Sequence, residues 1–342
     1  DVEILNSENF DGLGFSDLCF FQPKKVFLIT GNKVEIQYLN FVDNEIEDDL
    51  NEIKNGTEAA RGKTYTDIKI KLRIHKDEYF DKVNTMLEHI HRGDIYEANF
   101  CQEFYAENTL INPLETYQKL NRISKPPFAS YIKLQDKYVL SASPERYLKK
   151  QDNTIISQPI KGTAKRSMKA DEDELLKSNL SKDKKERSEN IMIADLVRND
   201  LSKTALKGSV TVEELCKIYT FDQVHHMIST ITSKVDSKTH PVDIIKSTFP
   251  MGSMTGAPKI SAMNIIEQLE ASKRGIYSGA IGYFSPSGDF DFNVVIRSIL
   301  YNQTKKYVSY SVGGAITAKS VPLKEYEECL VKAKAMREVL EN

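Results

Sequence analysis

A lysine held between a proline-led approach and a glycine-led turn is the first candidate for chemistry in this sequence. Lys161 lies in the run Pro159-Ile160-Lys161-Gly162-Thr163. The stiff Pro-Ile approach and the Gly-Thr turn suit an amine that is presented to a ligand. An uncharged amine in such a setting is a nucleophile. Most lysines are solvated surface charges, so this run alone leaves both interpretations open.

Two pairs of glutamates stand three residues apart, Glu186 with Glu189 and Glu325 with Glu328. At that spacing each pair falls on one face of a helix. Two such faces brought together would give an oxygen-rich site, and Mg²⁺ fits it because this ion uses few carboxylates and keeps waters and a ligand anion. Four close acids without a cation would repel one another. Each pair alone also fits an ordinary solvated helix face.

Two further positions carry groups that move protons. Glu145 follows Ser143 and Pro144 directly after a predicted strand. A carboxyl held at a strand end near an apolar surface has a raised pKa and serves as a general acid, whereas an exposed loop glutamate is the alternative. His225 and His226 are consecutive, so one can face a cleft while the other faces outward. A histidine in the core or on the surface is the commoner outcome.

Two glycine-containing segments suit close contact with a ligand. Residues 249–259 (FPMGSMTGAPK) lead into a predicted helix, whose first N–H groups and positive dipole end favour a phosphate or carboxylate. The spacing is not that of a Walker A loop, and GLGFSD at Gly12 does not complete a dinucleotide fingerprint. Gly313-Gly314-Ala315 ends a predicted strand with nearly bare backbone. A structural turn and a β-bulge are the alternatives for the two segments.

The elements that must position these residues follow from hydrophobic periodicity. Alternating runs rich in Val, Ile and Tyr predict two hairpins, the first around Gly31-Asn32, and three later strands. The predicted strands are residues 25–31, 33–39, 128–134, 137–142, 278–285, 290–301 and 306–314.

Helical spacing of apolar residues predicts five helices, with Asp77 and Gly93 as the ends of the first and Pro322 in the first turn of the last. The charged stretch 165–189 fits either a disordered linker or, from residue 183, the polar half of a helix. Helices clustered between hairpin-like strands indicate an α+β fold. The predicted helices are residues 77–92, 183–201, 241–249, 258–271 and 322–340.

Composition excludes several classes of protein. The 342 residues carry a net charge of −2, which gives no basic footprint for nucleic acid. No run of eighteen apolar residues predicts a membrane span, and the first ten residues lack the pattern of a secretory signal. The four cysteines are scattered without metal spacing, so we expect free thiols and a cytoplasmic location.

Taken in order, ten segments make the sequence similar to the chorismate-utilising enzymes over roughly residues 77–342. The segments are GDIYEANFCQEF, SASPERYL, PIKGT, ERSENIMIADLVRNDL, VHHMIS, FPMGSMTGAPK, RGIYSGAIGYFS, VVIRS, VGGAI and EYEECLVKAKAM. This family includes the synthase subunits for anthranilate and for 4-amino-4-deoxychorismate, and the isochorismate and salicylate synthases. The resemblance implies an α+β sandwich of two mostly antiparallel sheets with outer helices and a central active-site cleft. Residues 1–76 would be a short N-terminal part of that fold and 77–342 its catalytic domain.

Two positions discriminate among the family's branches. Members that form anthranilate, isochorismate or salicylate typically carry alanine before the Gly-Thr, whereas aminodeoxychorismate synthase component I typically carries the lysine found here at Lys161. Isochorismate and salicylate synthases place a lysine base where this chain has Glu97. Glu97 also departs from the glutamine common in the ammonia-using members, which leaves its role open. An anthranilate synthase component I is the alternative, and a chorismate-binding scaffold without activity is the non-enzymatic one.

The resemblance also implies how chorismate would be held. Mg²⁺ bound directly by Glu189 and Glu328, and through water by Glu186 and Glu325, would bind the ring carboxylate. Residues on several further segments would contact the substrate. Most would do so through backbone groups, and Arg297 through its charged guanidinium. These implied substrate-binding residues are Gly162, Thr163, Gly256, Ala257, Tyr277, Arg297, Gly313, Gly314 and Ala315.

The implied reaction is the amination of chorismate on the route to 4-aminobenzoate and folate. Lys161 would attack ring C2 while Glu145 protonates the departing C4 hydroxyl, and ammonia would then add at C4 and expel the lysine. His226 would contact the C4 region or line the site. Ammonia would come from glutamine through a separate amidotransferase subunit, because no glutaminase nucleophile elbow is seen in this sequence.

Overall fold

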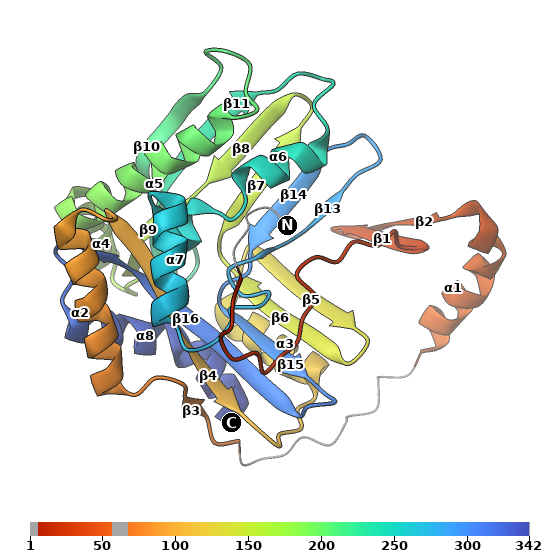
Figure 1. Ribbon diagram of the computed structural model, residues 1–342. Helices are drawn as coiled ribbons and strands as arrows, with labels where there is room; N and C mark the ends of the chain where they lie inside the picture. The colour runs from red at the N-terminus through yellow and green to blue at the C-terminus, as the bar shows by residue number, and fades with distance from the viewer. Residues whose placement is uncertain (1–5, 57–67, 342) are drawn as a thin grey trace. The chain divides into compact units, whose positions relative to one another are not determined.

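The computed structural model describes residues 6–56 and 68–341, and two seven-stranded sheets form its centre (Figure 1). The first sheet runs in the order β12–β4–β16–β15–β6–β5, and β3 pairs with β4 beside this path. Its strands pair antiparallel throughout. They are β3 (Lys71–Leu72), β4 (Glu97–Ala106), β5 (Phe128–Leu134), β6 (Lys137–Ser143), β12 (Gly256–Ala257), β15 (Ser298–Asn302) and β16 (Tyr307–Thr317).

The second sheet runs in the order β10–β11–β8–β7–β14–β13, and β9 pairs with β11 beside this path. It too is antiparallel at every pairing. Its strands are β7 (Arg146–Gln151), β8 (Thr154–Gln158), β9 (Ile160–Lys165), β10 (Thr211–Thr220), β11 (Val224–Lys234), β13 (Ala280–Phe284) and β14 (Phe290–Val294).

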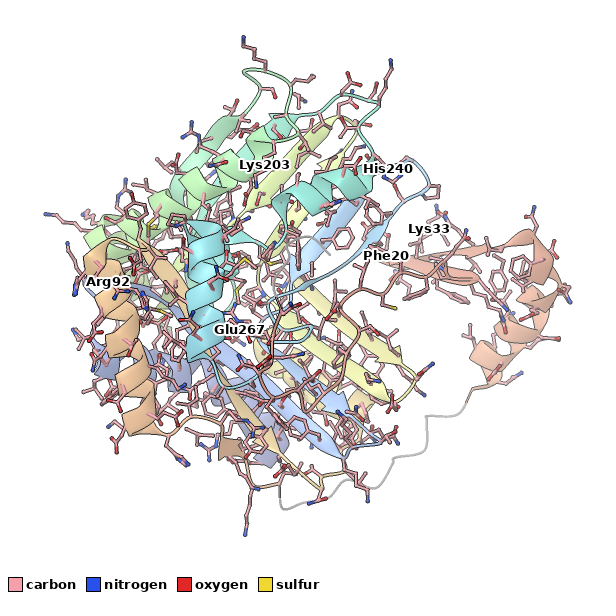
Figure 2. The ribbon with its side chains drawn as sticks, in the orientation of Figure 1. Phe20, Lys33, Arg92, Lys203, His240 and Glu267 are labelled. Carbon is pink, nitrogen blue, oxygen red and sulfur yellow. The ribbon has the colours of Figure 1, made fainter. Side chains whose placement is uncertain are left out.

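Helices cover the two sheets. Helices α3 and α8 pack on strands of the first sheet, with α2 against α8, and α5 packs across β9, β10 and β11 of the second (Figure 1). Long charged side chains such as Arg92 and Lys203 stand at the ends of α2 and α5 (Figure 2). The helices are α2 (Lys76–Arg92), α3 (Pro113–Ser124), α4 (Ala170–Lys182), α5 (Lys184–Ser202), α6 (Pro241–Thr248), α7 (Lys259–Leu269) and α8 (Pro322–Glu341).

Two apolar clusters hold this arrangement together. One gathers the inner faces of α2 and α8 against β4 and β16, for example Met86 and Met336 with Phe100 and Tyr310. The other joins α5 and α6 to the second sheet and reaches Val139 of the first sheet. Burial of apolar surface at both clusters stabilises the fold, at about 25 cal/mol per Å² removed from water. The predicted α+β sandwich of two antiparallel sheets is confirmed.

The charged stretch before α5 is helical. Residues 170–182 form α4, so a disordered linker there is wrong. Asp183 separates the two helices and caps α5, because its side chain accepts hydrogen bonds from the N–H groups of Lys185 (2.8 Å) and Glu186 (3.0 Å). The predicted helix 183–201 is confirmed within a residue at each end. The cap fixes the start of α5 and therefore the direction of its first acidic turn.

The predicted strand 290–301 is wrong in one respect that bears on the site. It is two strands, β14 in the second sheet and β15 in the first, separated by Val295-Ile296-Arg297. Arg297 has φ +53°, a left-handed conformation that breaks the extended chain. Hydrophobic periodicity cannot report this break, because both halves are rich in apolar residues and buried almost throughout. The break carries the chain from one sheet to the other.

Within Ser16–Lys63 the described residues, 16–56, form a separate compact unit. The unit holds β1 (Lys25–Thr30), β2 (Lys33–Tyr38), a 3-10 helix η1 (Asn40–Glu45) and α1 (Ile46–Asn55). The predicted hairpin is confirmed, with Gly31 at φ +58° in its turn. Lys25 bridges Asp49 (2.5 Å) and Glu45 (2.6 Å), which ties α1 to the hairpin. The predicted start of the catalytic part, residue 77, falls in the first turn of α2.

The cysteines confirm one expectation from composition. The four cysteines are free thiols, and three of them are buried. Among residues 6–56 and 68–341, no helix combines the length and the apolar character needed to cross a membrane.

Candidate active site

Lys161 sits at a bulge where β9 pairs with β11. The register shifts between His226 and Ile228 of β11, so Lys161 and Gly162 together oppose Met227. Gly162 has φ +93°, a conformation that favours glycine, and a side chain there would press on the α5 acid Glu186. A bulge of this kind bends a strand and re-aims its side chains. The sequence Lys-Gly thus places the amine at the point where β9 bends.

Glu145 lies where the chain crosses from β6 of the first sheet to β7 of the second. This crossing runs beside the one that carries Arg297 from β14 to β15. Ser143 Oγ donates to Val294 O (2.6 Å), and Val294 N donates to Glu145 O (3.0 Å). The two crossings therefore support each other and bring an acid and a guanidinium to the junction of the sheets.

The Glu145 carboxyl has the properties of a general acid near neutral pH. Its residue is 6% exposed, and burial raises its pKa to about 7. Hydrogen bonds from the Ser253 hydroxyl and the Ile160 backbone, with the positive charge of Lys161, act in the opposite direction. Because Ile160 directly precedes Lys161, the acid and the amine meet at one place. A carboxyl with this pKa is partly protonated at pH 7 and can give up its proton.

The two predicted glutamate pairs come together. Glu186 and Glu189 belong to α5, and Glu325 and Glu328 belong to α8. The ammonium of Lys185 lies 3.7 Å from Glu189 Oε1 and 3.6 Å from Glu325 Oε1. Burial raises the pKa values of Glu186 and Glu189, and repulsion by neighbouring carboxylates on both helices acts in the same direction, whereas nearby lysine ammonium groups act in the opposite direction. We call these residues the four-glutamate cluster.

The cluster combines buried oxygens with nearby cations. Glu189 Oε1 is buried and has no hydrogen-bond partner among the described residues. Partial burial alone would raise the pKa of Glu328, but the ammonium groups of Lys332, Lys185 and Lys161 outweigh it and hold that pKa below its ordinary value. Lys332 Nζ lies 2.6 Å from Glu328 Oε1 and donates to Gly313 O (2.8 Å). Positive charge is therefore needed where the two helices meet.

No ready-made metal centre accompanies this arrangement in residues 6–56 and 68–341. No three His, Cys, Asp or Glu side chains there converge closely enough to hold an ion as they stand. The lysines instead lie against the carboxylates, at ion-pair distances from Glu189, Glu325 and Glu328.

The residues expected to bind a carboxylate lie around the junction of the sheets. Burial lowers the pKa of Arg297, while the nearby Tyr277 and Glu328 act in the opposite direction. Tyr277 is buried, and its hydroxyl lies 3.7 Å from Cys101 Sγ. A side chain at Gly313 would come within 2.4 Å of the same sulfur, so only glycine fits this part of β16. The missing side chain at Gly313 therefore lets β4 pack closely against β16.

The glycine-rich segment differs from its predicted form. A short 3-10 helix (Gly252–Met254) and the two-residue strand β12 precede α7, which begins at Lys259. Gly256 and Ala257 therefore pair with Ala98 and Glu97 of β4 instead of opening the helix. Their side of the site is formed by sheet backbone, because long-range pairing with β4 overrides the local helix-start signal.

The two consecutive histidines have different surroundings. His226 faces the site strand β9, where its Nδ1 lies 2.9 Å from Thr163 Oγ1. Burial and the positive charge of Arg297 lower its pKa to about 4, so it is neutral at pH 7. His225 points the other way, and its Nε2 lies 3.0 Å from Asp173 Oδ1 of α4. The alternation expected for neighbours on a strand thus separates a site residue from a structural one.

A pocket with about 350 Å³ of empty space opens beside Glu145. Its wall includes Ser253 and Pro159, together with Val197 and Leu201 of α5. Glu145 therefore borders a small space between β7 and α5.

Comparison with known proteins agrees with this arrangement. The family model of the chorismate binding enzymes matches residues 6–338, nearly the whole chain. The chain belongs to the chorismate binding enzyme family. The crystal structure of anthranilate synthase component I from Streptococcus pneumoniae superposes with a TM-score of 0.81 at 27% identity, over 92% of this chain and 72% of that one.

Relatives in the family carry two kinds of name. Aminodeoxychorismate synthase component 1 of Klebsiella aerogenes is 38% identical over 79% of this chain and 59% of its own length. An anthranilate synthase component I-like protein of Synechocystis is 34% identical over 99% of this chain and 70% of its own. The chain spans between 28% and 59% of the length of the aminodeoxychorismate synthases it matches.

Four residues around the site escaped the sequence analysis. Ser253 donates to Glu145, Lys185 and Lys332 accompany the four-glutamate cluster, and Asn190 donates to the backbone of Lys161. The lysines offered one signal, since each stands on the same helix as a predicted metal ligand and four residues from it. Ser253 and Asn190 offered none, because their partners are distant in sequence.

Proposed function

We propose that this chain aminates chorismate at C4, giving 4-amino-4-deoxychorismate and water. The observation that carries the proposal is Lys161, an amine placed by a bulge beside the buried acid Glu145 and among the carboxylates of the four-glutamate cluster. Lysine before Gly-Thr is the residue typical of the aminodeoxychorismate-forming branch. Similarity to relatives named aminodeoxychorismate synthase component 1 supports the same choice.

The reaction balances as two successive displacements. The Lys161 nitrogen forms a bond to ring C2 while the two ring double bonds shift and the C4–O bond breaks. Glu145 gives the departing hydroxyl a proton, so water leaves. Ammonia then forms a bond to C4, the double bonds return, and the C2–N bond breaks so that Lys161 leaves as the neutral amine. The new C4 ammonium returns one proton to the Glu145 carboxylate, which restores the acid. Splitting one difficult substitution into two easier ones is the advantage of a covalent intermediate.

Residues at the junction of the sheets would orient the substrate. Arg297 offers a guanidinium for the enolpyruvyl carboxylate, with Tyr277 and the backbone of residues 313–315 beside it. His226, neutral at pH 7 and bonded to Thr163, would line the site without adding charge. Gly162 leaves room at this edge for the side chain of Glu186. Holding the ring in one orientation is worth as much to the rate as the chemical groups themselves.

Mg²⁺ is the cation that the four-glutamate cluster fits best. The donors are carboxylate oxygens only, Glu189 Oε1 is buried without a hydrogen-bond partner among the described residues, and Lys185 already places positive charge between Glu189 and Glu325. Glu189 and Glu328 would hold the ion directly, and Glu186 and Glu325 through water. When bound, the ion would supply electrostatic attraction for the ring carboxylate of chorismate.

Replacing Glu328 by alanine is expected to weaken Mg²⁺ binding by about 10-fold or more, because one charged ligand is lost. Calorimetric titration of the chain with Mg²⁺, with and without chorismate, measures this directly and does not depend on turnover. Glu327→Ala is the matched control, since Glu327 is the exposed neighbour on the same helix. An unchanged Mg²⁺ isotherm in Glu328→Ala would remove Glu328 from the ligand set.

Ammonia would be delivered by a glutamine amidotransferase acting as a second subunit. The designation component 1 of the bacterial relatives supports a two-part enzyme. A reducing cytoplasm suits the four free thiols of this chain. With ammonium salt supplied in excess, the chain alone should carry out the amination.

Product identification tests the proposal. The chain is incubated with chorismate, Mg²⁺ and ammonium salt, and the product is identified by mass spectrometry. We expect 4-amino-4-deoxychorismate, which a separate lyase then converts into 4-aminobenzoate. Anthranilate appearing without a lyase would instead support anthranilate synthase, the function favoured by the similarity to the Synechocystis relative. Chorismate bound but left intact, even with a glutaminase present, would indicate a binding subunit.

A further inference from the structure

Asn190, a buried amide on α5, is bonded to the bulge that carries Lys161. The residue is 1% exposed, and its Nδ2 donates to Met227 O (3.1 Å) and Lys161 O (3.4 Å). These carbonyls lie on opposite sides of the bulge, where the register of β9 and β11 is interrupted. Backbone carbonyls buried at such an interruption need another donor. The Asn190 amide supplies one to each strand.

The other end of the same amide reaches a second irregularity. Asn190 Oδ1 accepts from Ser229 Oγ of β11 and lies 3.6 Å from Cys216 Sγ of β10. Ser229 Oγ in turn accepts from Cys216 N (3.0 Å). Cys216 has φ +54° and falls where the register of β10 and β11 shifts. One side chain therefore joins two bulges of the sheet to helix α5.

We propose that Asn190 is a positioning residue, which fixes the bulge of β9 and so the direction in which the Lys161 amine leaves the strand. The inference rests on the proposed function, because it takes Lys161 as the nucleophile. Asn190 directly follows Glu189, so the turn of α5 that carries part of the four-glutamate cluster also holds Lys161. The amine and the acids are thereby kept at a fixed separation.

An amide is required at this position for a physical reason. Both carbonyls need a donor, and Ser229 needs an acceptor, so the position requires a group that does both. Alanine would leave both carbonyls of the bulge without this donor, and the bulge would relax towards regular pairing. A shift of Lys161 of about 1 Å is enough to lower the rate of a positioned reaction by about 10²-fold.

The test compares Asn190→Ala with Asn199→Ala, a control that removes an exposed asparagine from the same helix. With ammonium in excess, we expect kcat for amination to fall about 10- to 100-fold in Asn190→Ala. The dissociation constant of chorismate, measured by equilibrium binding, should stay within about threefold, because the ligand-contacting groups remain. Unchanged kcat, or loss of chorismate binding in parallel with kcat, would overturn the inference.

A double variant separates positioning from general damage. In a Lys161→Ala background, Asn190→Ala should leave the residual rate unchanged, since there is no amine left to aim. A further fall by the same factor as in the wild-type background would mean a structural role and overturn the inference. If Asn190→Ala does not fold, Ser229→Ala serves instead, because it removes one hydrogen bond of the same network. We expect kcat of Ser229→Ala to be about threefold lower, with chorismate binding intact. Wild-type kcat in Ser229→Ala would overturn the inference.

The same measurements distinguish this inference from the proposed function. Wild-type kcat in Lys161→Ala alone would mean that Lys161 is not the nucleophile, and the proposed function would fail. A large loss in Lys161→Ala together with wild-type kcat in Asn190→Ala would leave the function standing and refute only the role of Asn190.

Discussion

Replacing Lys161 by alanine is expected to lower formation of 4-amino-4-deoxychorismate by about 10³-fold or more, because the covalent route through C2 is lost. The fold should be retained, since the Lys161 side chain lies outside both apolar clusters and its backbone carbonyl keeps its bond to Asn190. Product formation measured by mass spectrometry, with thermal unfolding in parallel, checks both parts of the expectation.

Lys165→Ala is the matched control for this variant. Lys165 lies on the same strand, is exposed, and should retain wild-type activity. A second readout is the intermediate itself: incubating the wild-type chain with chorismate but without ammonia should add the mass of chorismate less water to the peptide that contains Lys161. Wild-type turnover in Lys161→Ala would refute covalent catalysis.

The sequence could predict the features of the site that depend on local spacing. The i,i+3 spacing of the glutamates gives one face of a helix whatever the rest of the fold does, and the structure brings the two pairs together around Lys185. The Lys-Gly pair at the bulge is equally local, because only glycine takes φ +93° easily. Helix α5 was placed within a residue for the same reason, since its cap and its periodicity lie within the segment.

Features set by long-range pairing could not be predicted. The crossing at Arg297 interrupts a run that is buried almost throughout, and only the assignment of its halves to two different sheets reveals it. The segment around Gly256 and Ala257 carries a helix-start signal. These two residues nevertheless form a strand, because they pair with β4, about 160 residues earlier in the chain. The contact of Glu145 with Ser253 and Ile160 depends on both crossings being in place.

The roles of Lys185 and Lys332 at the site could not be predicted from the sequence either. Lys185 and Lys332 each stand four residues from a predicted metal ligand, a spacing that reads equally well as a surface ion pair. Burial decides the case of Lys185, because its partners Glu189 and Glu325 are buried and their charges need compensation. The position of Lys332 is fixed by its hydrogen bond to Gly313 O (2.8 Å) as well as by Glu328. Sequence spacing carries no information on either contact, so the lysines acquire a role only in the folded chain.

Glu145→Gln is expected to lower the amination rate by about 10²- to 10⁴-fold, because an amide cannot protonate the departing hydroxyl. Burial raises the pKa of Glu145 to about 7, so its acid form is lost as the pH rises through that value. Wild-type kcat/KM for chorismate reports the free enzyme, so it should fall on the alkaline side with an apparent pKa near 7, and the variant should lack this limb. Rates measured from pH 5.5 to 9, at saturating free ammonia, check this.

Unfolding provides the control for the Glu145 prediction, because the same raised pKa has a calculable effect on stability. Below pH about 4.5 the carboxyl is protonated in both folded and unfolded chains and carries no penalty. As the pH rises to about 7 the unfolded chain releases this proton first, so wild-type stability falls. Above pH 7 the full penalty, about 3 kcal/mol, is present, and Glu145→Gln removes it. The variant should thus unfold at higher denaturant than wild type at pH 8 and not at pH 4.5, whereas the exposed Glu107→Gln should show no such difference. Equal stabilities of Glu145→Gln and wild type at pH 8 would mean that burial does not raise the pKa of this carboxyl, and the general-acid role would lose its physical basis.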